Sequence, residues 1–88
     1  MNKLRRKELT KAIQMLENAT AMLEEAEEMI EELRNEEQEV FENLAEESQS
    51  SAFGEAIEDN IRTLEDGAET ITECIDSITN LVDYLNYL

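Results

Sequence analysis

Apolar residues recur every seven positions along two long segments of the chain. The first ladder holds Leu9, Leu16, Leu23, Ile30 and Leu44, with Glu37 at its one polar step. The second ladder holds Ile57, Leu64, Ile71, Ile78 and Leu85. A seven-residue apolar period is typical of helices that pack side by side in coiled coils and bundles. The pattern predicts one helix over about residues 7–44 and a second over about residues 53–87.

Further apolar positions predict which side of each helix packs against the other. The second segment has a seam in alternating steps of four and three: Ile57, Ile61, Leu64, Ala68, Ile71, Ile75, Ile78, Val82 and Leu85. In the first segment, the row three residues beyond the ladder holds Ala12, Ala19, Ala26, Leu33 and Val40. Its alanines predict close approach of a partner helix, while Ile13 and Phe41 fall on the opposite flank. Gly67 and Ala68 predict another point of close contact between helices.

The segment between the helices, about residues 45–52, is predicted to be the turn. It contains Ser48, Ser50 and Ser51, and serine both caps helix starts and competes with helical backbone bonds. The chain has no proline and two glycines, which favours few, long elements. At 1.5 Å per residue each helix is roughly 50 Å long. Matched lengths predict an all-α fold, an antiparallel two-helix hairpin that forms one domain over residues 1–88.

Each helix also carries a third apolar row, which an isolated hairpin leaves in water. These rows hold Met15, Met22 and Met29 in the first helix, and Cys74, Leu81 and Leu88 in the second. A wide apolar face is typical of a helix in a bundle. We therefore expect a homodimer that forms a four-helix bundle, or a partner protein that fills the groove. The methionines could alternatively form a soft binding stripe.

The charge of the chain is large, negative and unevenly placed. The net charge is −16 over 88 residues. The first eleven residues nevertheless carry five basic side chains and one acidic side chain, so the rest of the chain is more acidic than the total indicates. Such a surface repels nucleic acid and anionic membrane and attracts basic proteins. The basic segment, residues 3–11, is expected either to neutralise nearby Asp76 and Asp83 or to hold phosphate or an acidic partner.

Cysteine content and hydropathy bear on location. Cys74 is the one cysteine, so no intramolecular disulfide is possible. No apolar run approaches the 18 or so residues of a membrane span, and no signal-peptide core follows the basic start. We expect a cytoplasmic protein that does not bind membrane.

Candidate chemistry is sparse. The chain has no histidine, and its paired glutamates fall on outer helix faces rather than pointing inward as in di-iron bundles. Residues 62–73 imitate a calcium loop in part, but Arg62 and Leu64 stand where ligands are needed. Cys74 has no histidine to activate it, and the neighbouring Glu73 and Asp76 disfavour a thiolate. We expect no metal, no cofactor and no enzymatic activity.

The outer carboxylates are the candidate partner-binding residues. They are Glu17, Glu24, Glu25, Glu28, Glu31 and Glu32 in the first helix, with Glu58, Asp59, Glu65, Asp66, Glu69 and Glu73 in the second. Carboxylates three or four residues apart on a helix lie about 5–6 Å from each other. That spacing is comparable with phosphates along a nucleic-acid strand, so the rod could occupy a basic groove. The other interpretation is that the acidity serves only solubility.

The chain resembles short, acidic, helical proteins from phages and mobile elements of Gram-positive bacteria. The resemblance rests on residues 2–7 (NKLRRK), residues 36–44 (EEQEVFENL) and the apolar ladder from Ile57 to Ile78. It implies an inhibitor of host defence, of which anti-CRISPR proteins are one type, acting in the host cytoplasm on a nucleic-acid-binding protein. The alternative is a structural dimerisation or assembly module. Secreted helical hairpins with a Trp-x-Gly turn do not fit, because Ala52, Phe53 and Gly54 occupy that place.

Overall fold

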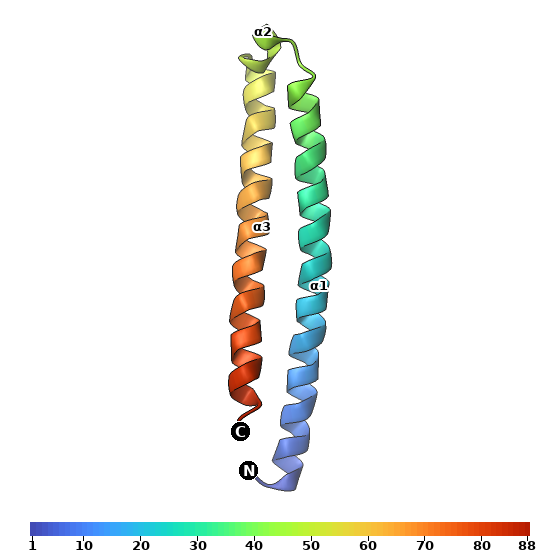
Figure 1. Cartoon of the computed structure of the whole chain (residues 1–88), viewed down its shortest axis with the longest axis vertical. Helices are drawn as coiled ribbons and strands as arrows, with labels where there is room; N and C mark the ends of the chain where they lie inside the picture. The colour runs from blue at the N-terminus through green and yellow to red at the C-terminus, as the bar shows by residue number, and fades with distance from the viewer.

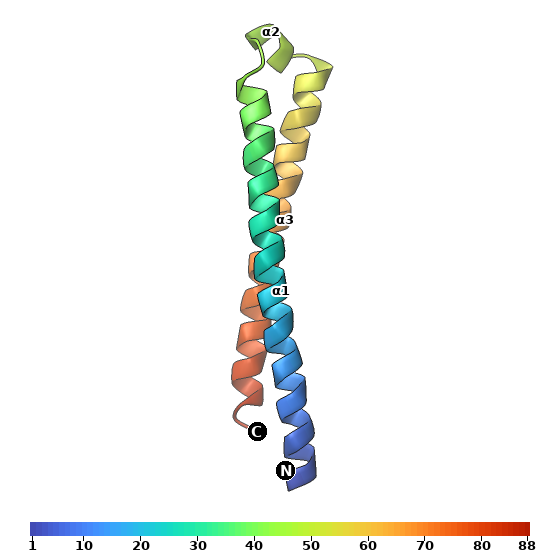
Figure 2. The same ribbon diagram turned by 90° about the vertical axis from the view of Figure 1, so that its right-hand side faces the viewer.

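A computed structural model describes all residues of the chain, 1–88, and confirms the all-α hairpin. Helix α1 (Lys3–Glu42) and helix α3 (Ala52–Leu85) lie side by side and antiparallel, joined by the short helix α2 (Glu46–Gln49) (Figure 1). The molecule is a rod of 68 × 15 × 14 Å. The two long helices wrap around each other along the rod, as a seven-residue period requires (Figure 2).

Helix α1 begins at Lys3, before the expected start near residue 7. The reason is a cap at Asn2, whose side-chain oxygen accepts a hydrogen bond from the Arg5 amide at 2.8 Å. At the other end the helix stops at Glu42 rather than near residue 44. Because α1 is longer than α3, its first turns extend beyond the end of α3 (Figure 1).

The expected turn contains a helical segment of its own, α2. Its first residues, Glu46 and Glu47, place negative charge where the helix dipole favours it. Gln49 fixes this segment to the end of α1, since its side-chain amide donates to the carbonyl oxygens of Phe41 at 3.1 Å and Leu44 at 3.3 Å. Ser51 caps α3, because its hydroxyl accepts from the Gly54 amide at 3.3 Å. The predicted capping role of serine in the turn is confirmed at Ser51.

Gly54 is the glycine on which close packing depends. It is buried in the first turn of α3, directly against the backbone of α2. A Cβ at this position would lie 2.5 Å from the Ser48 carbonyl oxygen and would also collide with the Gln49 carbonyl oxygen. The expected close contact at Gly67 is wrong, because a Cβ there would meet no atom within 4 Å.

The core is a single seam between α1 and α3. Its buried side chains are Ile57 and Ile61, close to the turn. Every other residue of the predicted α3 seam, from Leu64 to Leu85, is half-buried, so that prediction is confirmed. A two-helix rod has no interior beyond one seam, which is why burial is incomplete along most of its length.

The predicted seam of α1 is confirmed in its first row and only in part in its second row. Leu9, Leu16, Leu23 and Ile30 do face α3, but the row that completes the seam lies four residues beyond the ladder, not three. It holds Ile13, Thr20, Glu27, Arg34 and Phe41, all half-buried. In the row three residues beyond the ladder, Ala19 and Ala26 are half-buried beside the seam, while Ala12, Leu33 and Val40 are exposed. This choice keeps the two large side chains Ile13 and Phe41 in the seam and leaves the alanine row on a flank.

Candidate functional site

One long side of the hairpin, here called the carboxylate face, brings acidic side chains of both helices together. Its members are Glu17, Glu24, Glu28 and Glu31 of α1, with Glu58, Glu65 and Glu69 of α3. Glu31, Glu65 and Glu69 line one open hollow with Glu27 and Arg34. Glu17 lines a second hollow beside Asp83, and Glu58 lines a third beside Glu65. The face therefore runs along most of the rod.

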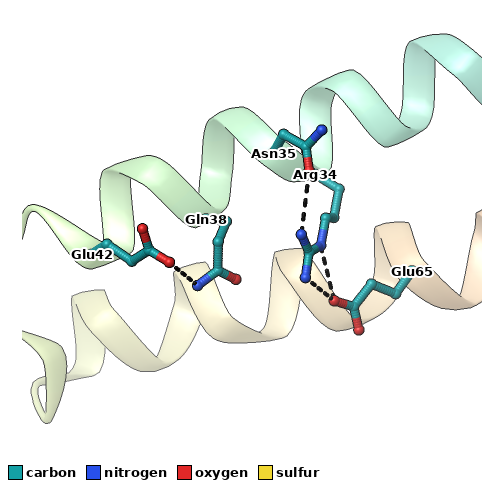
Figure 3. Close-up of polar contacts among 5 residues, drawn as sticks. All are labelled: Arg34, Asn35, Gln38, Glu42 and Glu65. Atoms are coloured by element: carbon teal, nitrogen blue, oxygen red, sulfur yellow. Dashed lines mark hydrogen bonds and ion pairs between the residues drawn. The ribbon is translucent and has the colours of Figure 1, made fainter.

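A single arginine from α1 interrupts the carboxylate face. The Arg34 guanidinium donates from Nε and Nη2 to the same oxygen of Glu65, at 2.9 and 2.8 Å (Figure 3). Its Nη1 donates to the Asn35 side chain at 3.2 Å. Farther toward the turn, Gln38 donates to Glu42 at 3.0 Å (Figure 3). Local positive charge at Arg34 offsets the repulsion where carboxylates of both helices converge.

Two residues of this region escaped prediction from the sequence. Glu27 is half-buried at the seam and accepts a hydrogen bond of 2.6 Å from the Thr72 hydroxyl. Arg34 occupies the next position of the same row. The signal was present, because Ile13 and Phe41 lie on that row and mark it as apolar at both ends. An inward-facing row with polar residues in its middle is easily mistaken for a solvent face.

The other predicted acidic residues lie on the backs of the helices. Glu25 and Glu32 are exposed on the side of α1 directly away from α3, one helical step of about 100° beyond Glu24 and Glu31. The back of α3 likewise exposes Asp59, Asp66 and Glu73. Within this set Asp59 has an ion-pair partner, Arg62, at 3.0 Å. The predicted acidic set is thus divided among one shared face and two separate backs.

The opposite long side of the hairpin is an apolar flank. On α1 it exposes Met15, Met22, Met29, Leu33 and Val40, and on α3 it exposes Cys74, Leu81 and Leu88. Leu33, Asn60 and Leu64 line one hollow. Leu64 also borders the hollow of Arg34 and Glu65, which opens on the carboxylate face. The rows of Leu33 and Asn60 are therefore neighbours, on the side away from the carboxylate face. Met22 is 71% exposed, and a contiguous apolar surface of this kind is typical of an interaction site.

The basic segment at the start of α1 makes few contacts. Lys11 lies 3.4 Å from Glu8, and the Arg6 guanidinium donates to the Leu88 main-chain oxygen at 3.2 Å. No ion pair joins this segment to Asp76 or Asp83. Within the single chain the basic segment therefore forms no direct ion pair with those two residues. They lie beside later turns of α1, while the first turns extend past the end of α3.

Other kinds of site find no support in the geometry. No group of three or more cysteine or acidic side chains is arranged to hold a metal ion. Cys74 is a free, exposed thiol on the apolar flank. No helix combines the length and the apolar composition that crossing a bilayer demands.

Comparison with protein-family models, with curated proteins and with solved structures finds no match for this chain. The resemblance to small acidic phage proteins therefore stays a prediction.

Proposed function

We propose that this protein is a non-enzymatic inhibitor that uses its carboxylate face to cover a basic, nucleic-acid-binding surface of another protein. The observation that carries the proposal is the convergence of acidic side chains from two antiparallel helices on one side of a rod 68 Å long. Members three or four residues apart, Glu24, Glu28 and Glu31 on α1 and Glu65 and Glu69 on α3, lie about 5–6 Å apart. That spacing is comparable with phosphates along a strand. A basic groove shaped for nucleic acid fits such a surface.

The charge on this face is available for binding. The structure has three ion pairs, and the Arg34–Glu65 pair is the one that joins the two helices on the carboxylate face. Arg62, which pairs with Asp59, borders the same face beside Glu58 and Glu65. Glu17, Glu24 and Glu31 are exposed and have no ion-pair partner. A rigid helix fixes their backbone, so no further backbone entropy is lost when a partner binds. The resemblance to phage proteins points to a host defence protein as the target, in the cytoplasm of the host.

The experiment compares two triple variants with the same change in charge. One reverses three charges on the carboxylate face, Glu24→Lys, Glu28→Lys and Glu31→Lys. The matched control reverses three on the helix backs, Glu25→Lys, Glu32→Lys and Asp66→Lys. Tagged proteins are used to capture partners from a bacterial lysate at 0.1 M and 0.5 M salt, with and without duplex DNA as competitor.

The proposal expects the wild type and the control to retain a nucleic-acid-binding protein that salt releases and DNA displaces. The variant of the carboxylate face should lose it. Equal loss in both variants would show that total charge, not this face, attracts the partner. Retention by the variant of the carboxylate face would refute the proposal.

A second candidate function is a structural dimerisation or assembly module, with acidity serving solubility. The exposed apolar flank favours it, since Met22 and Met29 are 71% and 65% exposed in the single chain. We propose a homodimer with the character of a four-helix bundle as the form in which this flank is covered. If changes at Met22 or Leu81 abolish activity while the carboxylate variant retains it, the assembly function is the correct one.

A further inference from the structure

We infer that the apolar flank packs against the same flank of a second copy in antiparallel orientation, with the two-fold axis passing close to Ala26. The inference rests on the proposed homodimer and adds its geometry. In this arrangement α1 lies on α1 of the partner copy, and α3 lies on α3. The turn end of each hairpin then lies beside the N-terminal end of the other.

The size of the flank is sufficient for a stable contact. From Ala12 to Val40 it extends over roughly 40 Å of helix, and the rod is 15 Å wide. These dimensions give a footprint of at most roughly 600 Å² per copy and about 1,200 Å² in total, the lower end of the range for specific interfaces. The surface is also built of side chains that adapt in shape, since methionine packs against irregular neighbours.

The distribution of charge along the rod favours the antiparallel orientation. The N-terminal end of α1 carries Lys3, Arg5, Arg6, Lys7 and Lys11 with the single acid Glu8. The turn end carries Glu36, Glu39, Glu42, Glu46 and Glu47, and the structure gives none of them an ion-pair partner. A parallel stack would place the two basic ends together and the two acidic ends together. The antiparallel stack places each basic end beside an acidic end, which removes both repulsions.

One of these basic residues, Arg5, lies on the edge of α1 that faces the second copy. Arg5 belongs to the same row as Ala12, Ala19 and Ala26, so it continues the apolar flank toward the N-terminal end. In the antiparallel stack centred near Ala26, Arg5 reaches the level of Glu46 and Glu47 of the second copy. Arg5 has no acidic partner within its own chain. A second copy supplies one.

Side-chain volume is compatible with the same pairing. The α1 row is small in its first half, at Ala12 and Ala19, and large in its second half, at Leu33 and Val40. Antiparallel stacking of α1 on α1 brings small residues opposite large ones, and the two copies of Ala26 face each other at the two-fold axis. Volume alone does not choose, because Ala19 could also face Leu81 in a parallel stack. The charges decide between the two.

The arrangement has a consequence for the proposed function. The carboxylate face lies on the side of the hairpin away from the flank, so dimerisation leaves it uncovered. The dimer presents two such faces on opposite sides, running in opposite directions. One inhibitor dimer would therefore hold two copies of a basic partner.

Purified protein alone tests the dimer. Sedimentation equilibrium on the wild type should give twice the chain mass of 10.1 kDa. Met22→Glu should give the mass of one chain with an unchanged helical circular dichroism signal, because Met22 is 71% exposed within the hairpin. Asn18→Glu adds the same charge at an exposed position on the back of α1 and should remain dimeric. A wild-type chain that is monomeric at 200 μM, or equal effects of the two variants, would overturn the inference.

Single-cysteine variants test the orientation. In a Cys74→Ser background, Ala26→Cys should form a disulfide-linked dimer on mild oxidation, because both thiols lie next to the two-fold axis. Ala12→Cys should not, since the two copies of residue 12 then lie roughly 40 Å apart. A parallel stack places α1 against α3 of the second copy, so neither residue 12 nor residue 26 would meet its counterpart. Failure of Ala26→Cys to cross-link, or equal cross-linking at 12 and 26, would refute the antiparallel arrangement. These measurements contain no partner protein, so they test the dimer independently of the proposed function. The triple variant Glu24→Lys, Glu28→Lys and Glu31→Lys should dimerise whether or not it loses partner binding.

Discussion

Arg34 and Glu65 form the one ion pair that joins α1 to α3. Two nitrogens of the guanidinium donate to a single carboxylate oxygen at 2.9 and 2.8 Å. The other ion pairs of the chain, Lys11–Glu8 and Arg62–Asp59, each lie within one helix. Glu27, Glu31 and Glu69 border the same hollow, so Arg34 is also the one positive charge among these carboxylates.

Replacing Arg34 should destabilise the hairpin more than replacing its partner. The side chains are 36% and 48% exposed, so the pair itself contributes about 0.5 kcal/mol. Arg34→Gln also leaves Glu65 among unneutralised carboxylates, and we expect a loss of about 1 kcal/mol. Glu65→Gln removes one of those carboxylates and should change stability by less than about 0.5 kcal/mol. Urea denaturation of the two single variants and the double variant measures the coupling. Equal losses in the two single variants would contradict this asymmetry.

The two glycines should respond in opposite ways to alanine. At Gly54 a Cβ collides with backbone atoms of Ser48 and Gln49, which have no side-chain freedom with which to move aside. Gly54→Ala should therefore destabilise by about 1–3 kcal/mol through overpacking. Gly67 is helical with open space around it, so Gly67→Ala should stabilise by about 1 kcal/mol from helix propensity. Thermal unfolding followed at 222 nm ranks the stability of both variants against the wild type. A destabilised Gly67→Ala would show that other atoms pack against residue 67.

Ile57 and Ile61 should dominate the stability of the monomeric hairpin. They are 5% and 8% exposed, whereas Leu81 on the apolar flank is 44% exposed. Ile61→Ala should lower the free energy of unfolding by about 2–4 kcal/mol. Leu81→Ala serves as the comparison. In a Met22→Glu background this change should lower the free energy of unfolding by less than about 1 kcal/mol. Similar losses at the two positions would mean that the seam is not where the structure places it.

The sequence was sufficient for the fold but not for the rotation of α1 about its axis. The α3 seam could be identified because every one of its positions, from Ile57 to Leu85, is apolar. On α1 the ladder is flanked by two candidate rows, and hydrophobicity favoured the row with Ala19, Ala26 and Leu33. The structure half-buries the whole row from Ile13 to Phe41, and its polar middle bonds to Thr72 and Glu65. Of the favoured row, Ala19 and Ala26 are half-buried but Leu33 is exposed. Pairing across the seam is a property of two helices together and is not contained in the pattern of either.

The candidate site was predictable to a similar degree. Net charge and helical spacing identified the acidic residues, but not which of them share a face. That division depends on the rotation of each helix, so Glu24 and Glu25, adjacent in sequence, lie on different sides of the rod. The same rotation explains why the apolar flank is wider than predicted. It includes Leu33 and Val40 as well as the methionine row.

Salt should stabilise the fold while it weakens binding to a basic partner. With a net charge of −16, folding gathers carboxylates on a narrow rod, and their repulsion is screened as the Debye length falls from about 10 Å at 0.1 M to about 3 Å at 1 M salt. If screening relieves about 1 kcal/mol, the melting temperature rises by about 5 °C. Differential scanning calorimetry in 0.02–1 M sodium chloride measures the shift. Glu24→Gln, Glu28→Gln and Glu31→Gln together should raise the melting temperature at low salt and reduce its salt dependence. A melting temperature that falls with added salt would mean that attraction, not repulsion, dominates the electrostatics of the folded chain.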